Sequence, residues 1–104
     1  MNYYGPAHID VIGKRCVSYA IETADPERCV DEIVRSFDRG AVGVEPQGDK
    51  AVSFRRMGEK GIEYFAWVNM TYLENVTWVI AHFLDEPTLV GRFRNALGQM
   101  KQNP

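Results

Sequence analysis

The stretch 62–84 limits the folds open to this chain more than any other part of the sequence. It consists of two long apolar segments joined at 71–74. A strand with one buried face normally alternates apolar and polar residues. Phe65 and Trp67 do not fit such an alternation, because the set of positions between and around them is also apolar: Ile62, Tyr64, Ala66, Val68 and Met70. Both faces of this hairpin therefore carry apolar side chains, and both need cover.

Length and composition indicate one globular domain spanning 1–104. The chain has 104 residues, of which 45% are apolar and 25% are charged. A chain of this size can bury a single core without disulfides or metals. The formal net charge of −2 and a pI near 5.6 give no general attraction to nucleic acid or to an anionic membrane.

The N-terminal sequence has neither a basic segment nor an apolar run, so we expect no secretory signal. The longest apolar run, 76–84, is interrupted by His82 and is far shorter than the roughly 20 residues of a membrane span. We therefore expect a cytoplasmic protein that does not bind a membrane.

The first quarter of the chain is expected to be mostly extended. Residues 1–7 would form an irregular arm, because Gly5-Pro6 is a breaker. From 8 to 22, β-branched and aromatic residues indicate one or two extended pieces, interrupted at Gly13.

A helix is predicted to start at Asp25, whose carboxylate can cap the first turn, with Pro26 at the first helical position. Its apolar stripe follows at helical spacing and consists of Val30, Ile33, Val34 and Phe37. Gly40 would end the helix as its C-cap.

Short strands separated by turns are expected next. They are 41–45, a segment around 52–55, and 62–70, with turns at 46–49 and 58–61. The segment 76–84 has two interpretations. The residues 71–74 match a helix capping box, but 76–80 have strong strand preference, and we favour a strand.

A last helix is expected after Asp85-Glu86-Pro87. Gly91 and Gly98 within it suggest the close approach of another backbone, and 102–104 would be a frayed tail. The complete prediction is an α+β fold in the order βαββββα. An antiparallel sheet of four to five strands would have both helices on one face.

With both helices on one side, the other face of this sheet would be left without cover, and pairing Met70 with Asn75 decides which residues lie on it. Large aromatic side chains with a polar border are typical of protein interfaces. The predicted partner-binding residues on that face are Glu63, Phe65, Trp67, Trp78, Ile80 and His82, with Asn69 beside them. One helix on each face, or an arm with Tyr3 and Tyr4 folded over it, would remove the need for a partner.

No motif in the sequence names a reaction. Phosphate-binding loops and a nucleophile elbow are absent, and two cysteines and two histidines are too few for common zinc sites. We therefore predict no catalytic residues, no metal and no cofactor. The basic residues Arg55, Arg56 and Lys60 lack interleaved aromatic residues, so a nucleic-acid partner is disfavoured.

Two functions remain from this reading. The favoured one is a small protein-interaction or homodimerising module, of the inhibitor, immunity or adaptor type, that binds through the aromatic face. The alternative is a ligand-binding or enzymatic domain in which the aromatic face lines a pocket, with Glu63 and His82 as its polar groups.

Overall fold

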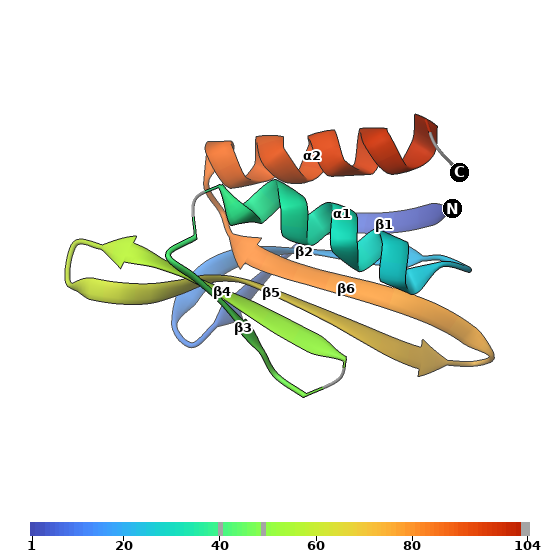
Figure 1. Ribbon diagram of the computed structural model, residues 1–104, viewed down its shortest axis with the longest axis horizontal. Coiled ribbons are helices and arrows are strands. Elements are labelled where there is room, and N and C mark those ends of the chain that lie inside the picture. The colour runs from blue at the N-terminus through green and yellow to red at the C-terminus, as the bar shows by residue number, and fades with distance from the viewer. Residues whose placement is uncertain (40, 49, 103–104) are drawn as a thin grey trace.

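A computed structural model describes residues 1–39, 41–48 and 50–102 of the chain. The fold is one antiparallel sheet with two helices packed on the same side of it (Figure 1). Along the chain the elements are β1 (Asn2–Val11), β2 (Lys14–Glu22), α1 (Pro26–Asp38), β3 (Gly43–Pro46), β4 (Ala51–Gly58), β5 (Gly61–Leu73), β6 (Val76–Leu84) and α2 (Pro87–Gln102). The strands are ordered β1-β2-β6-β5-β4-β3 across the sheet.

The α+β class is confirmed, but the predicted number of strands is wrong. Six strands are present where four or five were expected, and the element order is ββαββββα. Neither helix, within the described residues, is long and apolar enough to cross a membrane.

The additional strand, β1, combines most of the expected irregular arm, 1–7, with 8–11, which was expected to be extended. Residues 2–11 pair with β2, and a two-residue turn at Ile12-Gly13, both with positive φ, joins the two strands. Gly5 and Pro6 are accommodated by a shift in the pairing between Tyr4 and Ala7. This is possible because β1 lies at the edge of the sheet, where a proline costs no ladder hydrogen bond.

The helix α1 forms where the sequence predicted it. The Asp25 side chain accepts a hydrogen bond from the Arg28 backbone N–H at 3.3 Å, and Pro26 occupies the first turn. The proposed C-cap, Gly40, lies outside the described residues. So do Asp49 of the expected 46–49 turn and residues 103–104 of the expected tail, whereas Gln102 ends α2.

The ambiguous segment 76–84 is a strand, β6. It is joined to β5 by a two-residue turn at Glu74-Asn75, both with positive φ, and not by a loop at 71–74. Met70 pairs with Val79 and not with Asn75. This change in register is even, so each residue of β6 still faces the side of the sheet that was predicted.

Five phenylalanine side chains with no solvent exposure hold the helices against the sheet. Phe37 of α1 lies at their centre, with ring centroids 5.6 Å from Phe54, 6.2 Å from Phe65, 5.3 Å from Phe83 and 6.3 Å from Phe93. Because Phe93 belongs to α2, this cluster places both helices on one side of β4, β5 and β6.

A β-bulge in β5 changes which residues face the helices. Phe54 pairs with Ala66 and the next residue, Arg55, pairs with Tyr64, so Phe65 is an extra residue in β5. Phe65 and Ala66 are both fully buried. From Tyr64 towards the start of the strand, the alternation is therefore the reverse of the predicted one.

The glycines of α2 provide a first test of this fold. A Cβ added at Gly91 or Gly98 would meet nothing within 4 Å, so the close backbone approach suggested by the sequence does not occur. We expect Gly91→Ala and Gly98→Ala each to raise the free energy of unfolding by about 0.5–1 kcal/mol in urea denaturation, because glycine is a poor helix former.

Gly5→Ala is the matched control. Gly5 has a φ of +132°, and a Cβ there would lie 2.7 Å from the Ser18 carbonyl oxygen. The same substitution should therefore destabilise the protein at this position. Stabilisation at Gly5, or destabilisation at both α2 positions, would contradict the packing described here.

Candidate functional site

The side of the sheet opposite the helices, which we call the open face, has no described helix or loop packed over it (Figure 1). Cross-strand pairing assigns its residues, because paired residues point to the same side of a sheet. The open face includes Tyr4, Ser18, Ala20, Glu22, Glu45, Ala51, Ser53, Arg55, Tyr64, Trp67, Asn69, Thr71, Trp78, Ile80 and His82. The same alternation continues at its margins with Met57, Ile62, Leu73 and Val76, and with Lys14, Cys16 and Leu84, of which Cys16 and Leu84 are buried.

Two aromatic pairs stand on this face. Tyr64 stacks on Trp67 with ring centroids 6.4 Å apart, and Tyr4 lies against Trp78 at 5.8 Å. Along β6, Trp78 is four residues from His82, which pairs with Trp67, so the two aromatic pairs are separated by roughly 13 Å. Tyr4 is 58% and Tyr64 38% exposed, and both tryptophans are partly exposed.

Between the aromatic pairs runs a row of mostly smaller side chains. Ala20, Ile80, Asn69 and Ala51 are neighbours across four strands in that order. The next row places Ser18, His82, Trp67, Ser53 and Glu45 side by side. Ala20, Ile80 and Asn69 thus lie between Trp78 and Trp67, and Tyr4 flanks Ala20 at one end of their row.

Some polar groups on the open face have hydrogen-bond partners within the protein, and others do not. Ser53 is buried and donates to the Glu45 carbonyl oxygen at 3.4 Å, while the Gln47 amide donates to Ser53 at 3.3 Å. The Tyr64 hydroxyl donates to Glu45 at 2.8 Å, which raises the pKa of Tyr64. In contrast, Nε of Arg55 and Nδ1 of His82 are enclosed and have no hydrogen-bond partner among the described residues.

Four of the six predicted partner-binding residues lie together on the open face. They are Trp67, Trp78, Ile80 and His82. The placement of the other two was wrong, because the bulge turns Phe65 and Glu63 to the helix side. Sequence reasoning also missed Tyr64 and Tyr4, although three consecutive apolar residues at 64–66 are a signal that a bulge interrupts the alternation.

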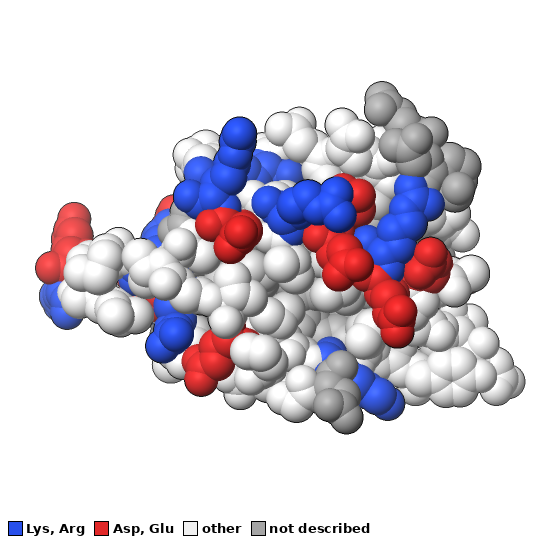
Figure 2. Space-filling view, viewed as in Figure 1, with Lys and Arg blue, Asp and Glu red and all other residues white. Residues whose placement is uncertain are grey.

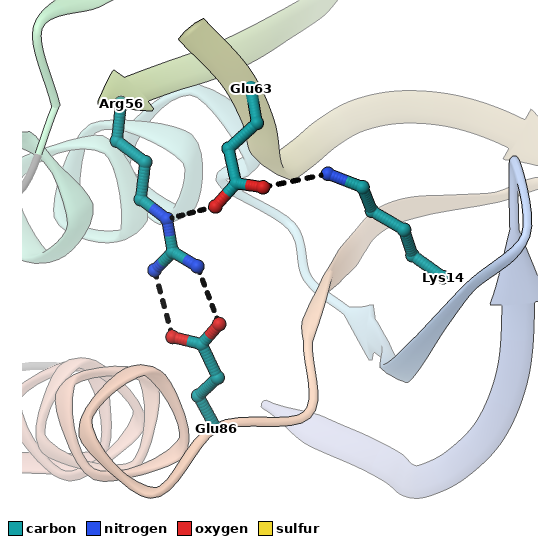
Figure 3. Close-up of polar contacts among 4 residues, drawn as sticks. All are labelled: Lys14, Arg56, Glu63 and Glu86. Atoms are coloured by element: carbon teal, nitrogen blue, oxygen red, sulfur yellow. Dashed lines mark hydrogen bonds and ion pairs between the residues drawn. The ribbon is translucent and has the colours of Figure 1, made fainter. Parts of the chain in front are cut away.

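Glu63 belongs instead to an ionic cluster that links two hairpins to α2 (Figure 3). It accepts hydrogen bonds from Lys14 Nζ at 3.0 Å and from Arg56 Nε at 2.9 Å. The two remaining guanidinium nitrogens of Arg56 donate to both carboxylate oxygens of Glu86. The guanidinium carbon of Arg56 also lies 5.4 Å from the centre of the Phe65 ring. Each charge in the cluster has an opposite charge beside it, so we assign the cluster a structural role.

These contacts shift the acid–base equilibria of the cluster. Hydrogen bonds from Lys14 and Arg56 lower the pKa of Glu63, and the bonds from Arg56 lower the pKa of Glu86. The pKa of Arg56 is raised by Glu86 and Glu63. Arg56 is therefore fully paired and is not available to an external phosphate in this arrangement.

Charged residues elsewhere do not form a one-sign surface. Figure 2 shows Lys and Arg interspersed with Asp and Glu over the helical side of the molecule. At open-face positions the central strands β5 and β6 carry no Asp, Glu, Lys or Arg. The charged residues of this face, Glu22, Arg55 and Glu45, lie on β2, β4 and β3, to either side of the two central strands.

Nucleophilic and metal chemistry finds little support in the described part of the chain. Cys16 and Cys29 are buried free thiols, and burial raises the pKa of both, that of Cys29 to about 12. No group of three His, Cys, Asp or Glu residues within 1–39, 41–48 and 50–102 is placed to hold a metal ion.

A hollow lies at one end of the sheet, where Glu22 of the open face is among its lining residues. It has a volume of about 510 Å³ and is formed where the start of α1, the β5–β6 turn and the two ends of the described chain meet; among its lining residues are Met1, Asp25, Cys29, Asn75 and Met100. Glu63 and His82, the polar pair expected in an aromatic pocket, do not share one face of the sheet.

No protein-family model, curated protein or solved structure matches this chain. The indications of function therefore come from the open face and the chemistry of its residues.

The reversed alternation in β5 makes Phe65 and Trp67 respond differently to truncation. Phe65→Ala should lower the free energy of unfolding by about 3–5 kcal/mol, because it removes a fully buried ring. Trp67→Ala should cost about 1 kcal/mol in dilute protein, because this side chain is only partly buried. Equal losses in chemical denaturation would contradict the assigned faces.

The ionic cluster predicts an acid-sensitive stability. Carboxyls whose pKa is lowered by folding stabilise the protein above their ordinary pKa, and this contribution is lost as the pH falls through the lowered value. We expect stability to fall below about pH 4.5. Arg56→Met should lose about 1 kcal/mol at pH 7 and show a shallower acid dependence. An unchanged acid dependence in urea titrations of this variant would remove the role assigned to the cluster.

Proposed function

We propose that the chain is a small homodimerising interaction module, and that a second copy of the chain packs against the open face. The observation that carries this proposal is the uncharged aromatic surface around Trp67, Ile80 and Trp78, which no other described element covers. Indole rings that are partly exposed to water have apolar surface left to bury, and a partner that covers them gains the corresponding hydrophobic free energy.

The size of the face supports a second copy as the partner. Strands β2 and β6 are nine residues long. Six strands at about 4.8 Å spacing and about 3.3 Å per residue give a face on the order of 700 Å². Stable interfaces bury about 800 Å² on each partner. A second copy of the chain presents an equal sheet face and so matches this area.

The charges and the relief of the open face also suit a copy of itself. Glu22, Glu45 and Arg55 lie on β2, β3 and β4, and the two central strands β6 and β5 carry no charge on this side, so two such faces can meet without placing like charges at the centre. The aromatic side chains of one copy can pack against Ala20, Ile80 and Asn69 of the other. Two sheets packed face to face in this way form a sandwich about 10 Å thick.

We further propose that this module acts in the cytoplasm as an inhibitor, immunity or adaptor protein, for which assembly and not catalysis is the activity. In the alternative function, the aromatic face lines the binding site of a small molecule. That alternative requires a monomer whose open face is free to receive the ligand.

Light scattering coupled to size-exclusion chromatography distinguishes these functions. At micromolar concentration and pH 7.5, the wild-type chain should have about twice its 11.8 kDa monomer mass. Trp67→Glu should return it to a monomer, because a buried charge in the centre of the interface raises the dissociation constant about 30-fold or more.

Tyr72→Glu is the matched control. Tyr72 lies on the same strand at a helix-side position and is 66% exposed, so it presents a comparable aromatic ring outside the open face. This variant should remain dimeric. A wild-type chain that is monomeric at all concentrations would favour the ligand-binding alternative, and a dimer lost only in Tyr72→Glu would place the interface elsewhere.

A further inference from the structure

His82 occupies the middle of the open face. On β6 it has Ile80 and Leu84 two residues to either side, and its cross-strand neighbours are Ser18 on β2 and Trp67 on β5. Its Nδ1 atom is enclosed by the protein and has no hydrogen-bond partner among the described residues. The imidazole is therefore held in a mainly apolar setting before any partner binds.

No carboxylate is an immediate neighbour of this imidazole. The titratable or charged groups that share its side of the sheet are Tyr4 on β1, Lys14, Cys16 and Glu22 on β2, Glu45 on β3, Arg55 on β4 and Tyr64 on β5. Glu45 is separated from His82 by Trp67 and Ser53, and its carboxylate contacts Tyr64 and Arg55. Glu22 is four residues from Ser18, at the end of β2.

A second copy packed on the open face would present the same groups. It would remove the remaining water around His82. Within its own copy a protonated imidazole has no adjacent carboxylate as a counter-ion, and burying such a charge is strongly unfavourable.

We propose that protonation of His82 controls the self-association of this chain, so that the dimer forms with neutral His82 and dissociates when the imidazole is charged. This inference rests on the proposed function, because it requires the open face to be the dimer interface. It names a regulatory property that the homodimer proposal does not itself require.

The expected pH window follows from the direction of the shift. Burial lowers the pKa of His82, and a group whose pKa is lowered by burial takes up its proton preferentially where it is exposed. Association should therefore be strongest above the ordinary histidine pKa of about 6.5 and should weaken as the pH falls below it. Glu63 and Glu86, with lowered pKa values, stay ionised at pH 5.

The chain contains a built-in control, because it has only one other histidine. His8 lies on β1 opposite Val17, on the helix side, with 63% of its side chain exposed and Nδ1 at 3.8 Å from Asp85. It is therefore not part of the open face.

Sedimentation equilibrium at pH 7.5 and pH 5.0 tests the inference, with circular dichroism confirming a folded chain at both values. The dissociation constant of the wild-type dimer should rise about tenfold or more at pH 5.0, since two histidines contribute per dimer. His8→Gln should show the same rise. His82→Gln and His82→Phe, which cannot be protonated, should associate equally at both pH values.

The possible failures are separable. Absence of a wild-type dimer at pH 7.5 overturns the proposed function itself. A dimer with the same dissociation constant at both pH values overturns only the role of His82. The same holds if His82→Gln or His82→Phe keeps the pH dependence, or if His8→Gln abolishes it.

Discussion

The packing of Phe37 against four other phenylalanines determines the architecture of this protein. Because Phe37 contacts rings from β4, β5, β6 and α2, both helices are fixed on one side of the sheet. The described chain contains no third helix that could cover the other side. The aromatic residues of the open face are therefore left without a helix over them, and they form the surface that the proposed dimer would use.

The sequence predicted the parts of this arrangement that depend on local signals. Asp25 and Pro26 located the start of α1, and the alternation in β6 placed Trp78, Ile80 and His82 correctly even though the pairing partner of Met70 was wrong. An even error in register leaves each side chain on its own face. The class of fold follows from such local patterns together with a chain long enough for one core.

The remaining errors arise from features that periodicity does not reveal. A single extra residue at Phe65 reverses the facing of Glu63 and Tyr64, which moves a predicted site residue into an ionic cluster and brings a tyrosine onto the open face. Gly5 and Pro6 predict an irregular arm, but an edge strand tolerates both. Bulges and edge positions depend on tertiary pairing, so a local pattern alone cannot assign them.

In the proposed dimer, a second copy of the chain covers the open face. The most direct measurement is an isotope-filtered nuclear Overhauser experiment on a mixture of labelled and unlabelled protein at neutral pH, which detects only contacts between copies. The account predicts intermolecular contacts from the indole protons of Trp67 and Trp78 and from the methyl groups of Ile80. Intermolecular contacts confined to the helices, or none at concentrations where the chain is fully associated, would contradict it.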